Sequence, residues 1–268
     1  MARLAYGLKL AWLNIGFYSG LIFMTAFSIV FISAPALCWL RYARGFDKGT
    51  AMRRLVWYYG RAWTKLLAVF VPLRLENCDR PLPKPCIITP NHQSFFDTYC
   101  FAFMPEPDVV FAVRAWPFRI PFYGPYMKLA GYLNTESERP EELLRQSKAV
   151  LDKGACIGVF PEGTRSTDGR MRRFHGGAFH LAVIAGVPVL PVCVDGTGIF
   201  LRKGGLLLRP ASIAIRVLDP VHPQAFADTG EEAPLVLRRT VKARIQEALD
   251  ALRSDVPHET DSNLKPKE

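Results

Sequence analysis

A run without a single charged residue extends from Leu10 to Leu40, between Lys9 and Arg41. A helix needs about 20 mostly apolar residues to cross a bilayer, and this run has 31. Three residues that weaken helices interrupt it: Gly16, Gly20 and Pro35. The run therefore fits either one tilted transmembrane helix or a helical hairpin that enters one leaflet of the bilayer.

A secretory signal peptide is the competing interpretation of this segment. Ala34 and Ala36 have the small side chains of a cleavage site. However, Pro35 lies between them, and the apolar run is longer than the core of a signal peptide. We therefore expect the segment to be retained as a membrane anchor.

Basic residues are more frequent after the apolar run than before it. Arg3 and Lys9 precede the run, and seven basic residues follow it: Arg41, Arg44, Lys48, Arg53, Arg54, Arg61 and Lys65. If the run crosses the membrane, the positive-inside bias places the rest of the chain on the cytoplasmic side.

Aromatic and aliphatic residues mix with the basic ones between Met52 and Val71. This composition is typical of a helix that lies in the headgroup layer of a membrane. An ordinary amphipathic helix packed on the following domain would have it too. We predict that residues 1–71 form membrane-anchoring hydrophobic and amphipathic helices.

The composition of the 268-residue chain excludes several classes of protein. With 50% hydrophobic and 22% charged residues, the chain is too apolar to be disordered. A net charge of +10 indicates an anionic partner, such as a membrane surface, a phosphorylated substrate or a nucleic acid. Nucleic acid is disfavoured because the basic residues cluster beside the apolar run and no nucleic-acid-binding motif occurs. None of the six cysteines forms a C-x-x-C pair, which argues against a zinc site.

Residues 72–253 alternate short apolar runs with longer helical patterns. The predicted strands are Cys86–Thr89, Val109–Val113, Cys156–Phe160, Val187–Val194 and Ser212–Leu218. The predicted helices are Phe95–Phe103, Arg139–Lys153, Gly177–Ala185 and Pro234–Arg253. Such alternation predicts an α/β domain with a mixed, largely parallel central sheet flanked by helices. Residues 254–268 are polar and are predicted to form a flexible tail.

Two residues with acid–base chemistry follow the first predicted strand. His92 lies in the turn, and Asp97 lies in the first turn of the next predicted helix. A carboxylate that reaches back from the helix could hold the imidazole as a general base. The alternative is a capping box formed by Ser94 and Asp97, with His92 as a surface turn residue.

A second polar cluster follows the strand Cys156–Phe160. Gly163 allows its backbone N–H to approach a ligand oxygen, and Arg165 offers a planar guanidinium for phosphate. The alternative is an ordinary polar turn. A base beside a phosphate site, on a chain with a membrane anchor, would suit a phosphorylated lipid as substrate.

The sequence H-x-x-x-x-D at 92–97, followed by Phe-Pro-Glu-Gly-Thr-Arg-Ser at 160–166, resembles the motif pair of the 1-acylglycerol-3-phosphate acyltransferase family. The apolar segment 187–192 with its two prolines resembles a further motif of that family. The similar region extends from about residue 72 to residue 218, over half of the chain. The resemblance implies the transfer of an acyl group from acyl-CoA or acyl-carrier protein to the hydroxyl of a lysophospholipid, with no cofactor and no metal.

The resemblance also implies roles for individual residues. His92 would be the general base, and Asp97 would orient it. The residues of the second motif would bind the head group of the acceptor: Glu162, Gly163, Thr164, Arg165 and Ser166.

The chain departs from the family at one position. The family has a phosphate-binding Arg in its second motif, where this chain has Ser137 after Glu136. Arg114 or Arg139 could substitute for it, and we take Arg114 as a further candidate for substrate binding. A different lysolipid, such as a lyso-ornithine lipid, therefore stays an alternative acceptor. A non-catalytic lipid-binding membrane adaptor is the alternative from another class of function.

Overall fold

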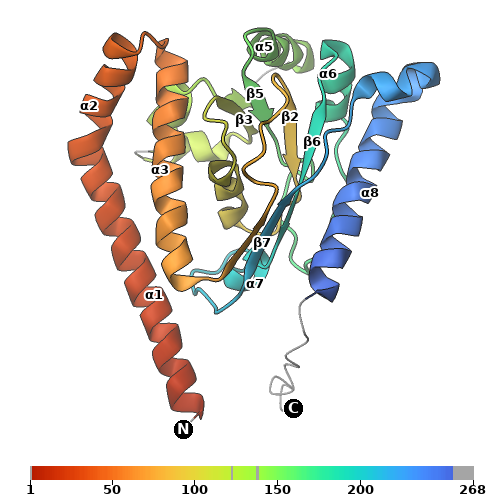
Figure 1. The fold of residues 1–268 in the computed structure, drawn as a ribbon. Helices are drawn as coiled ribbons and strands as arrows, with labels where there is room; N and C mark the ends of the chain where they lie inside the picture. Colours follow the sequence, from red (N-terminus) through yellow and green to blue (C-terminus); the bar gives the residue numbers. More distant parts are fainter. Residues whose placement is uncertain (1, 122, 137–138, 256–268) are drawn as a thin grey trace.

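The computed structural model describes residues 2–121, 123–136 and 139–255 (Figure 1). A seven-stranded sheet with the order β1-β7-β6-β2-β5-β3-β4 lies at its centre. The strands are β1 (Leu73–Glu76), β2 (Ile87–Pro90), β3 (Val109–Val113), β4 (Leu133–Asn134), β5 (Cys156–Gly158), β6 (Val189–Asp195) and β7 (Ile213–Val217). The five strands from β6 to β4 run parallel, and only the β6–β7 pair is antiparallel. The predicted mixed, largely parallel α/β fold is confirmed.

Helices cover both faces of the sheet (Figure 1). On one face lie α1 (Ala2–Phe27), α3 (Lys48–Phe70) and the 3₁₀ helix η3 (Phe95–Phe103), and on the other lie α5 (Pro140–Asp152), α6 (Gly177–Ala185) and α8 (Ala233–Ser254). The shorter helices are α2 (Ser33–Cys38), α4 (Tyr123–Leu129), α7 (Thr197–Phe200), η4 (Trp116–Arg119) and η5 (Pro223–Glu232). Two single π-helical segments, η1 (Ser28–Ile32) and η2 (Trp39–Ala43), flank α2.

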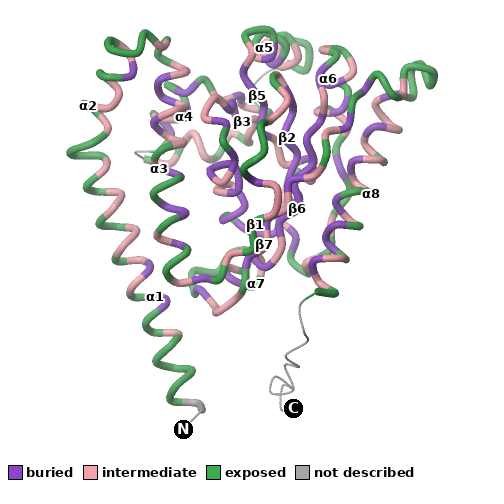
Figure 2. Tube along the Cα trace, viewed as in Figure 1, coloured by how far each residue is buried: buried purple, intermediate pink, exposed green. Residues whose placement is uncertain are grey.

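The segments α1, η1, α2 and η2 follow one another without a break, and together they form one helix from Leu4 to Ala43, 40 residues in length. By length and composition, it is the one helix in the described part of the chain that could cross a membrane. Its outer surface is exposed (Figure 2) and carries large apolar side chains: Trp12, Ile15, Ile22, Phe23, Val30 and Phe31. These side chains have the character expected of the predicted membrane anchor.

The inner side of α1 belongs to the core of the protein. Phe17 is fully buried, and its ring packs edge-on against Trp63 of α3 and Phe200 of α7. The same hydrophobic cluster includes residues of β2, β6 and β7. The division at residue 72 predicted from the sequence therefore marks a change in composition, and the hydrophobic core continues across it.

Helix α3 follows a well-defined N-cap. The carboxylate of Asp47 accepts hydrogen bonds from the backbone N–H groups of Gly49 and Thr50, at 2.9 and 3.1 Å, which satisfies donors that a helix start leaves free. The helix ends at Phe70, just before Pro72. Its buried face packs on η3 and α1 and joins the hydrophobic cluster that covers the sheet, so the amphipathic pattern predicted from residue 52 onward has packing partners within the protein.

Candidate active site

Three loops meet at the carboxyl edge of the parallel strands. They follow the neighbouring strands β6, β2 and β5, and they carry Thr197, His92 and Glu162. In open α/β sheets, ligands bind at this edge of the sheet.

His92 and Asp97 are brought together as the sequence predicts. Nδ1 of His92 lies 2.9 Å from Oδ2 of Asp97. A carboxylate only accepts hydrogen bonds, so Nδ1 carries a proton, and in the neutral form of the ring Nε2 is the nitrogen with the lone pair. The ring stacks on Phe160, with the ring centroids 4.0 Å apart, and 15% of the side chain stays exposed. The arrangement therefore directs proton transfer by the imidazole to Nε2.

The carboxylate of Asp97 is fully buried and receives three further hydrogen bonds. The backbone N–H groups of Gln93 and Ser94 donate to Oδ2, and the hydroxyl of Thr197 donates to Oδ1. The capping box of Ser94 and Asp97 is therefore present as well. The capping box and the His92–Asp97 contact exist together, because one carboxylate caps η3 and binds Nδ1 of His92. The general-base role of His92 stays a prediction.

The turn that carries His92 is fastened to β6. The side chain of Asn91 accepts from the N–H of Val194 at 2.7 Å and donates to the carbonyl of Val194 at 2.8 Å. This buried side chain thus makes the pair of backbone hydrogen bonds that a neighbouring strand would make, and it holds the residue immediately before His92 in place. Asn91 was not a candidate in the sequence analysis, because its partner lies 103 residues away.

The second motif holds both backbone groups of His92. The N–H of His92 donates to Oε1 of Glu162 at 2.7 Å, and the N–H of Ser166 donates to the carbonyl of His92 at 2.8 Å. Oε2 of Glu162 accepts from the N–H of Arg172 at 2.8 Å. The two motifs therefore form one hydrogen-bonded unit.

Glu162 is only 3% exposed, and both of its carboxylate oxygens accept from backbone groups. Burial raises the pKa of this carboxyl group, since removal from water disfavours the charged form. The predicted role in head-group binding stays a prediction. The contacts of Glu162 in the structure are those of a clamp on the His92 loop.

The remaining residues of the second motif form the turn beyond Glu162. The N–H of Gly163, predicted to approach a ligand, donates instead to the carbonyl of Phe160 at 3.0 Å. Its φ of +65° is a left-handed conformation that favours glycine. The Thr164 hydroxyl and the Arg165 carbonyl accept from Nζ of Lys203, at 3.1 and 3.2 Å. Lys203 was not predicted, because it lies 39 residues away.

Arg114 lies at the same edge of the sheet, just after β3 and two strands from β2. Its guanidinium is paired with Glu136, with Nε 2.5 Å from Oε1. Both side chains are substantially exposed. Ser137 lies outside the described residues. Glu136 thus neutralises the cation that the sequence offered as a substitute for the missing Arg.

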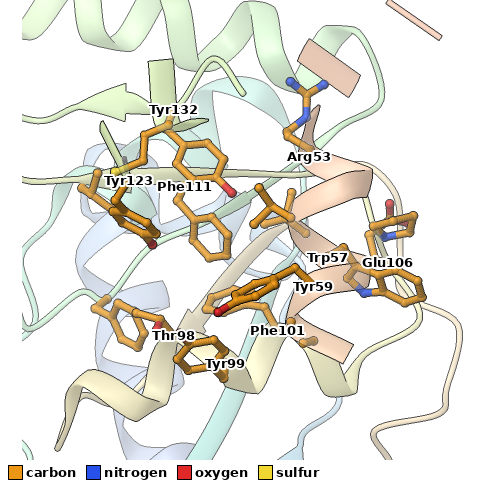
Figure 3. Close-up of a pocket in the computed structure, with 18 residues that line it drawn as sticks. Arg53, Trp57, Tyr59, Thr98, Tyr99, Phe101, Glu106, Phe111, Tyr123 and Tyr132 are labelled. Atoms are coloured by element: carbon orange, nitrogen blue, oxygen red, sulfur yellow. The ribbon is translucent and has the colours of Figure 1, made fainter. Parts of the chain in front are cut away.

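A largely apolar cavity of about 110 Å³ lies between α3, η3 and β3 (Figure 3). Aromatic rings line most of it: Tyr59, Tyr99, Phe101, Phe111, Tyr123 and Tyr132. Phe160 belongs to its wall, and the ring of Phe160 also stacks on His92. The cavity therefore lies directly behind the imidazole. Among the described residues, no group of three His, Cys, Asp or Glu side chains is arranged to hold a metal ion.

Comparison with known proteins identifies the family. The family model described as Acyltransferase matches residues 74–195. A 1-acyl-sn-glycerol-3-phosphate acyltransferase of Salmonella typhimurium is 32% identical over 199 residues, which cover 70% of this chain and 79% of the relative. The chain belongs to the 1-acyl-sn-glycerol-3-phosphate acyltransferase family. A family member from Chlamydomonas reinhardtii is 38% identical over 157 residues, or 57% of this chain.

The family fold extends over the chain. The crystal structure of the 1-acyl-sn-glycerophosphate acyltransferase PlsC from Thermotoga maritima covers 96% of this chain and is itself covered completely, with a TM-score of 0.73 and 26% identity. This chain spans about half of the length of several plant and algal members of the family, between 41% and 57%.

Proposed function

We propose that the protein is a membrane-bound O-acyltransferase that converts 1-acylglycerol 3-phosphate to phosphatidic acid. The observation that carries the proposal is the His92–Asp97 pair, whose loop is hydrogen-bonded to the second motif and whose imidazole stacks on Phe160 in the wall of an apolar cavity. Membership in the family supports the same reaction.

In the proposed reaction, His92 acts as the general base. Nε2 takes the proton from the acceptor hydroxyl, and the oxygen attacks the carbonyl carbon of the acyl thioester. The tetrahedral intermediate then expels the thiolate of CoA or of acyl-carrier protein, which takes the proton from the imidazolium. Asp97 keeps Nδ1 protonated and stabilises the imidazolium. The reaction needs neither a covalent enzyme intermediate nor a cofactor.

The cavity provides a place for the acyl chain of the donor. Its lining is aromatic and aliphatic over most of its surface, with Arg53 and Glu106 also on its wall. A thioester whose chain enters this cavity would present its carbonyl close to Phe160 and His92. The acceptor would approach from the opposite side, over the turn that carries Thr164 and Arg165.

The general-base role is tested by His92→Ala, assayed with acyl-CoA and lysophosphatidic acid. We expect turnover to fall by at least about 10²-fold, the usual contribution of such a base. The matched control is His180→Ala, because His180 is exposed on α6 and lies outside the site. Unchanged turnover in the His92 variant would remove this mechanism.

The head-group role of Arg165 is tested by Arg165→Ala. We expect the KM of the acceptor to rise more than the KM of the donor, because the guanidinium would contact only the acceptor phosphate. Arg239→Ala, on the exposed side of α8, is the control for a general loss of charge. Equal effects on both KM values would place Arg165 outside the acceptor site.

A different lysolipid is the second candidate for the acceptor. The pairing of Arg114 with Glu136 favours it, since one cation at the edge is already neutralised. A panel of lysolipids with one labelled acyl donor distinguishes the two candidates. Absence of thioester release with every acceptor would instead support a non-catalytic membrane adaptor.

We also propose that the N-terminal helix holds the enzyme in the membrane, with the catalytic residues on the cytoplasmic side. The proposal rests on the exposed apolar surface of Leu4–Ala43 and on the excess of basic residues after it. A protease-cleavable tag after Glu268, assayed in sealed vesicles of both orientations, tests the side. Cleavage only from the outer face of right-side-out vesicles would contradict it.

A further inference from the structure

The segment 201–209, between α7 and β7, connects the candidate acceptor site with helix α1. Its base is closed by a hydrogen bond from the Arg209 N–H to the Phe200 carbonyl, at 2.8 Å. The hydroxyl of Ser94, two residues after His92 in the loop after β2, donates to the carbonyl of Leu201 at 2.9 Å. The segment is therefore held against the loop that carries the imidazole.

Lys203 is the residue of this segment that reaches the second motif. Its ammonium group donates to the Thr164 hydroxyl and to the Arg165 carbonyl, at 3.1 and 3.2 Å. Both acceptors are uncharged, and an ammonium group has three N–H donors. Within the described ranges, no carboxylate lies within ion-pair distance of Lys203. One donor and the full positive charge thus remain available to a ligand.

Of the other cations at this edge, Arg114 differs from Lys203 in that respect and Arg165 does not. Glu136 neutralises Arg114, whereas no ion pair involves Arg165 in the described part of the chain. A phosphomonoester carries a charge of about −1.5 to −2 at neutral pH, so two cations are needed to balance it. Lys203 and Arg165 are two such cations, and the hydrogen bonds of Lys203 to Thr164 and to the Arg165 carbonyl bring them together.

We propose that Lys203 binds the terminal phosphate of the acceptor lipid and is a specificity-determining residue of this enzyme. The inference rests on the proposed function, because it assumes an acceptor with a phosphomonoester. Lys203 supplies the second positive charge in place of the Arg that the second family motif lacks here.

The far end of the segment explains how Lys203 keeps its place. The side chain of Asn14 donates to the carbonyl of Leu208 and accepts from its N–H, both at 2.9 Å, and the Tyr18 hydroxyl donates to the carbonyl of Leu206. Leu206 is 82% exposed and lies beside the apolar helix. The segment therefore extends from α1 to the turn that carries Thr164 and Arg165. A lipid head group that arrives along α1 would reach the ammonium group of Lys203.

The test uses Lys203→Gln in the full-length enzyme. Gln removes the charge and keeps N–H donors on a side chain of similar shape. We expect the KM for lysophosphatidic acid to rise about tenfold, the lower end for a hydrogen bond to a charged group. The KM for the thioester and the KM for 1-acylglycerol, which has no phosphate, should be unchanged. Lys203→Arg should restore most of the loss.

Arg202→Gln is the matched control, because Arg202 is an exposed cation of the same segment. An equal rise in KM in this control, or a Lys203→Gln variant as active as wild type, would overturn the inference. So would an equal loss with 1-acylglycerol, which would indicate a purely structural role.

Measurement of lysophosphatidic acid binding by the His92→Ala variant, with and without Lys203→Gln, separates this inference from the proposed function. In that background, Lys203→Gln should weaken the binding of lysophosphatidic acid in detergent micelles about tenfold, whether or not the parent enzyme turns this lipid over. Normal turnover by wild type with no effect of Lys203→Gln refutes only the inference. No turnover with a clear effect on binding refutes only the proposed reaction.

Discussion

Replacement of Glu162 by Gln distinguishes a clamp from a ligand of the head group. In wild type, each carboxylate oxygen of this buried side chain accepts from one partly buried backbone N–H, of His92 and of Arg172. A Gln side chain has one carbonyl oxygen, so its NH₂ group must face one of these donors. A buried donor without a partner costs about 1–3 kcal/mol. At about 2 kcal/mol, the Tm of a domain of this size should fall by roughly 4–8 °C.

The same substitution should lower kcat. Loss of the clamp frees the backbone of His92, and a misplacement of about 1 Å can cost about 10²-fold in rate. The two KM values should change little, because the clamp does not touch substrate. Steady-state kinetics with both substrates and a thermal melt in detergent provide the measurement, with exposed Glu247→Gln as the control. A higher acceptor KM at unchanged kcat and Tm would refute the clamp and support the head-group role.

Three further predictions follow from the structure. Because burial raises the pKa of Glu162, the folded protein binds that proton more tightly than the unfolded chain. The free energy of unfolding of wild type should therefore fall relative to that of Glu162→Gln as the pH rises through the raised pKa, as chemical unfolding between about pH 4 and pH 7 can check. Gly196→Ala should cost more than about 1–2 kcal/mol and reduce activity, since φ is +83° and a Cβ would lie 1.9 Å from a backbone oxygen. A melt against Gly177→Ala, where a Cβ meets nothing within 4 Å, is the check. Val113→Phe should shift the preference toward shorter acyl chains, because Val113 lines the cavity, and an unchanged profile in a competition among acyl-CoA species would contradict this.

Local patterns in the sequence were sufficient for most of the fold. The helices η3 and α6 have the predicted bounds, although η3 is a 3₁₀ helix, and the strand at Val109–Val113 is as predicted. Strand β1 was missed, because its four residues alternate with charges and lie at an edge of the sheet. The predicted strand Cys156–Phe160 ends at Gly158, where the chain turns into the second motif.

The site was predictable only where its residues are close in sequence. His92 and Asp97 are five residues apart, and their contact could be anticipated from the helix start between them. The bond between His92 and Glu162 joins residues 70 apart, and the contacts of Asn91 and Lys203 are also long-range. No local pattern distinguishes a clamp carboxylate from a ligand carboxylate. That difference depends on which donors the fold brings to it.

The burial of Phe17 has a practical consequence. A soluble catalytic fragment would ordinarily be sought by cutting the chain after its apolar N-terminal helix. Here such a cut would remove the ring that fills the space between Trp63, Phe96 and Phe200. It would also release the segment that Asn14 holds beside the acceptor turn. Helix α1 therefore belongs to the hydrophobic core of the domain that carries the candidate active site. We expect an active enzyme only from the intact chain, prepared in detergent or in nanodiscs.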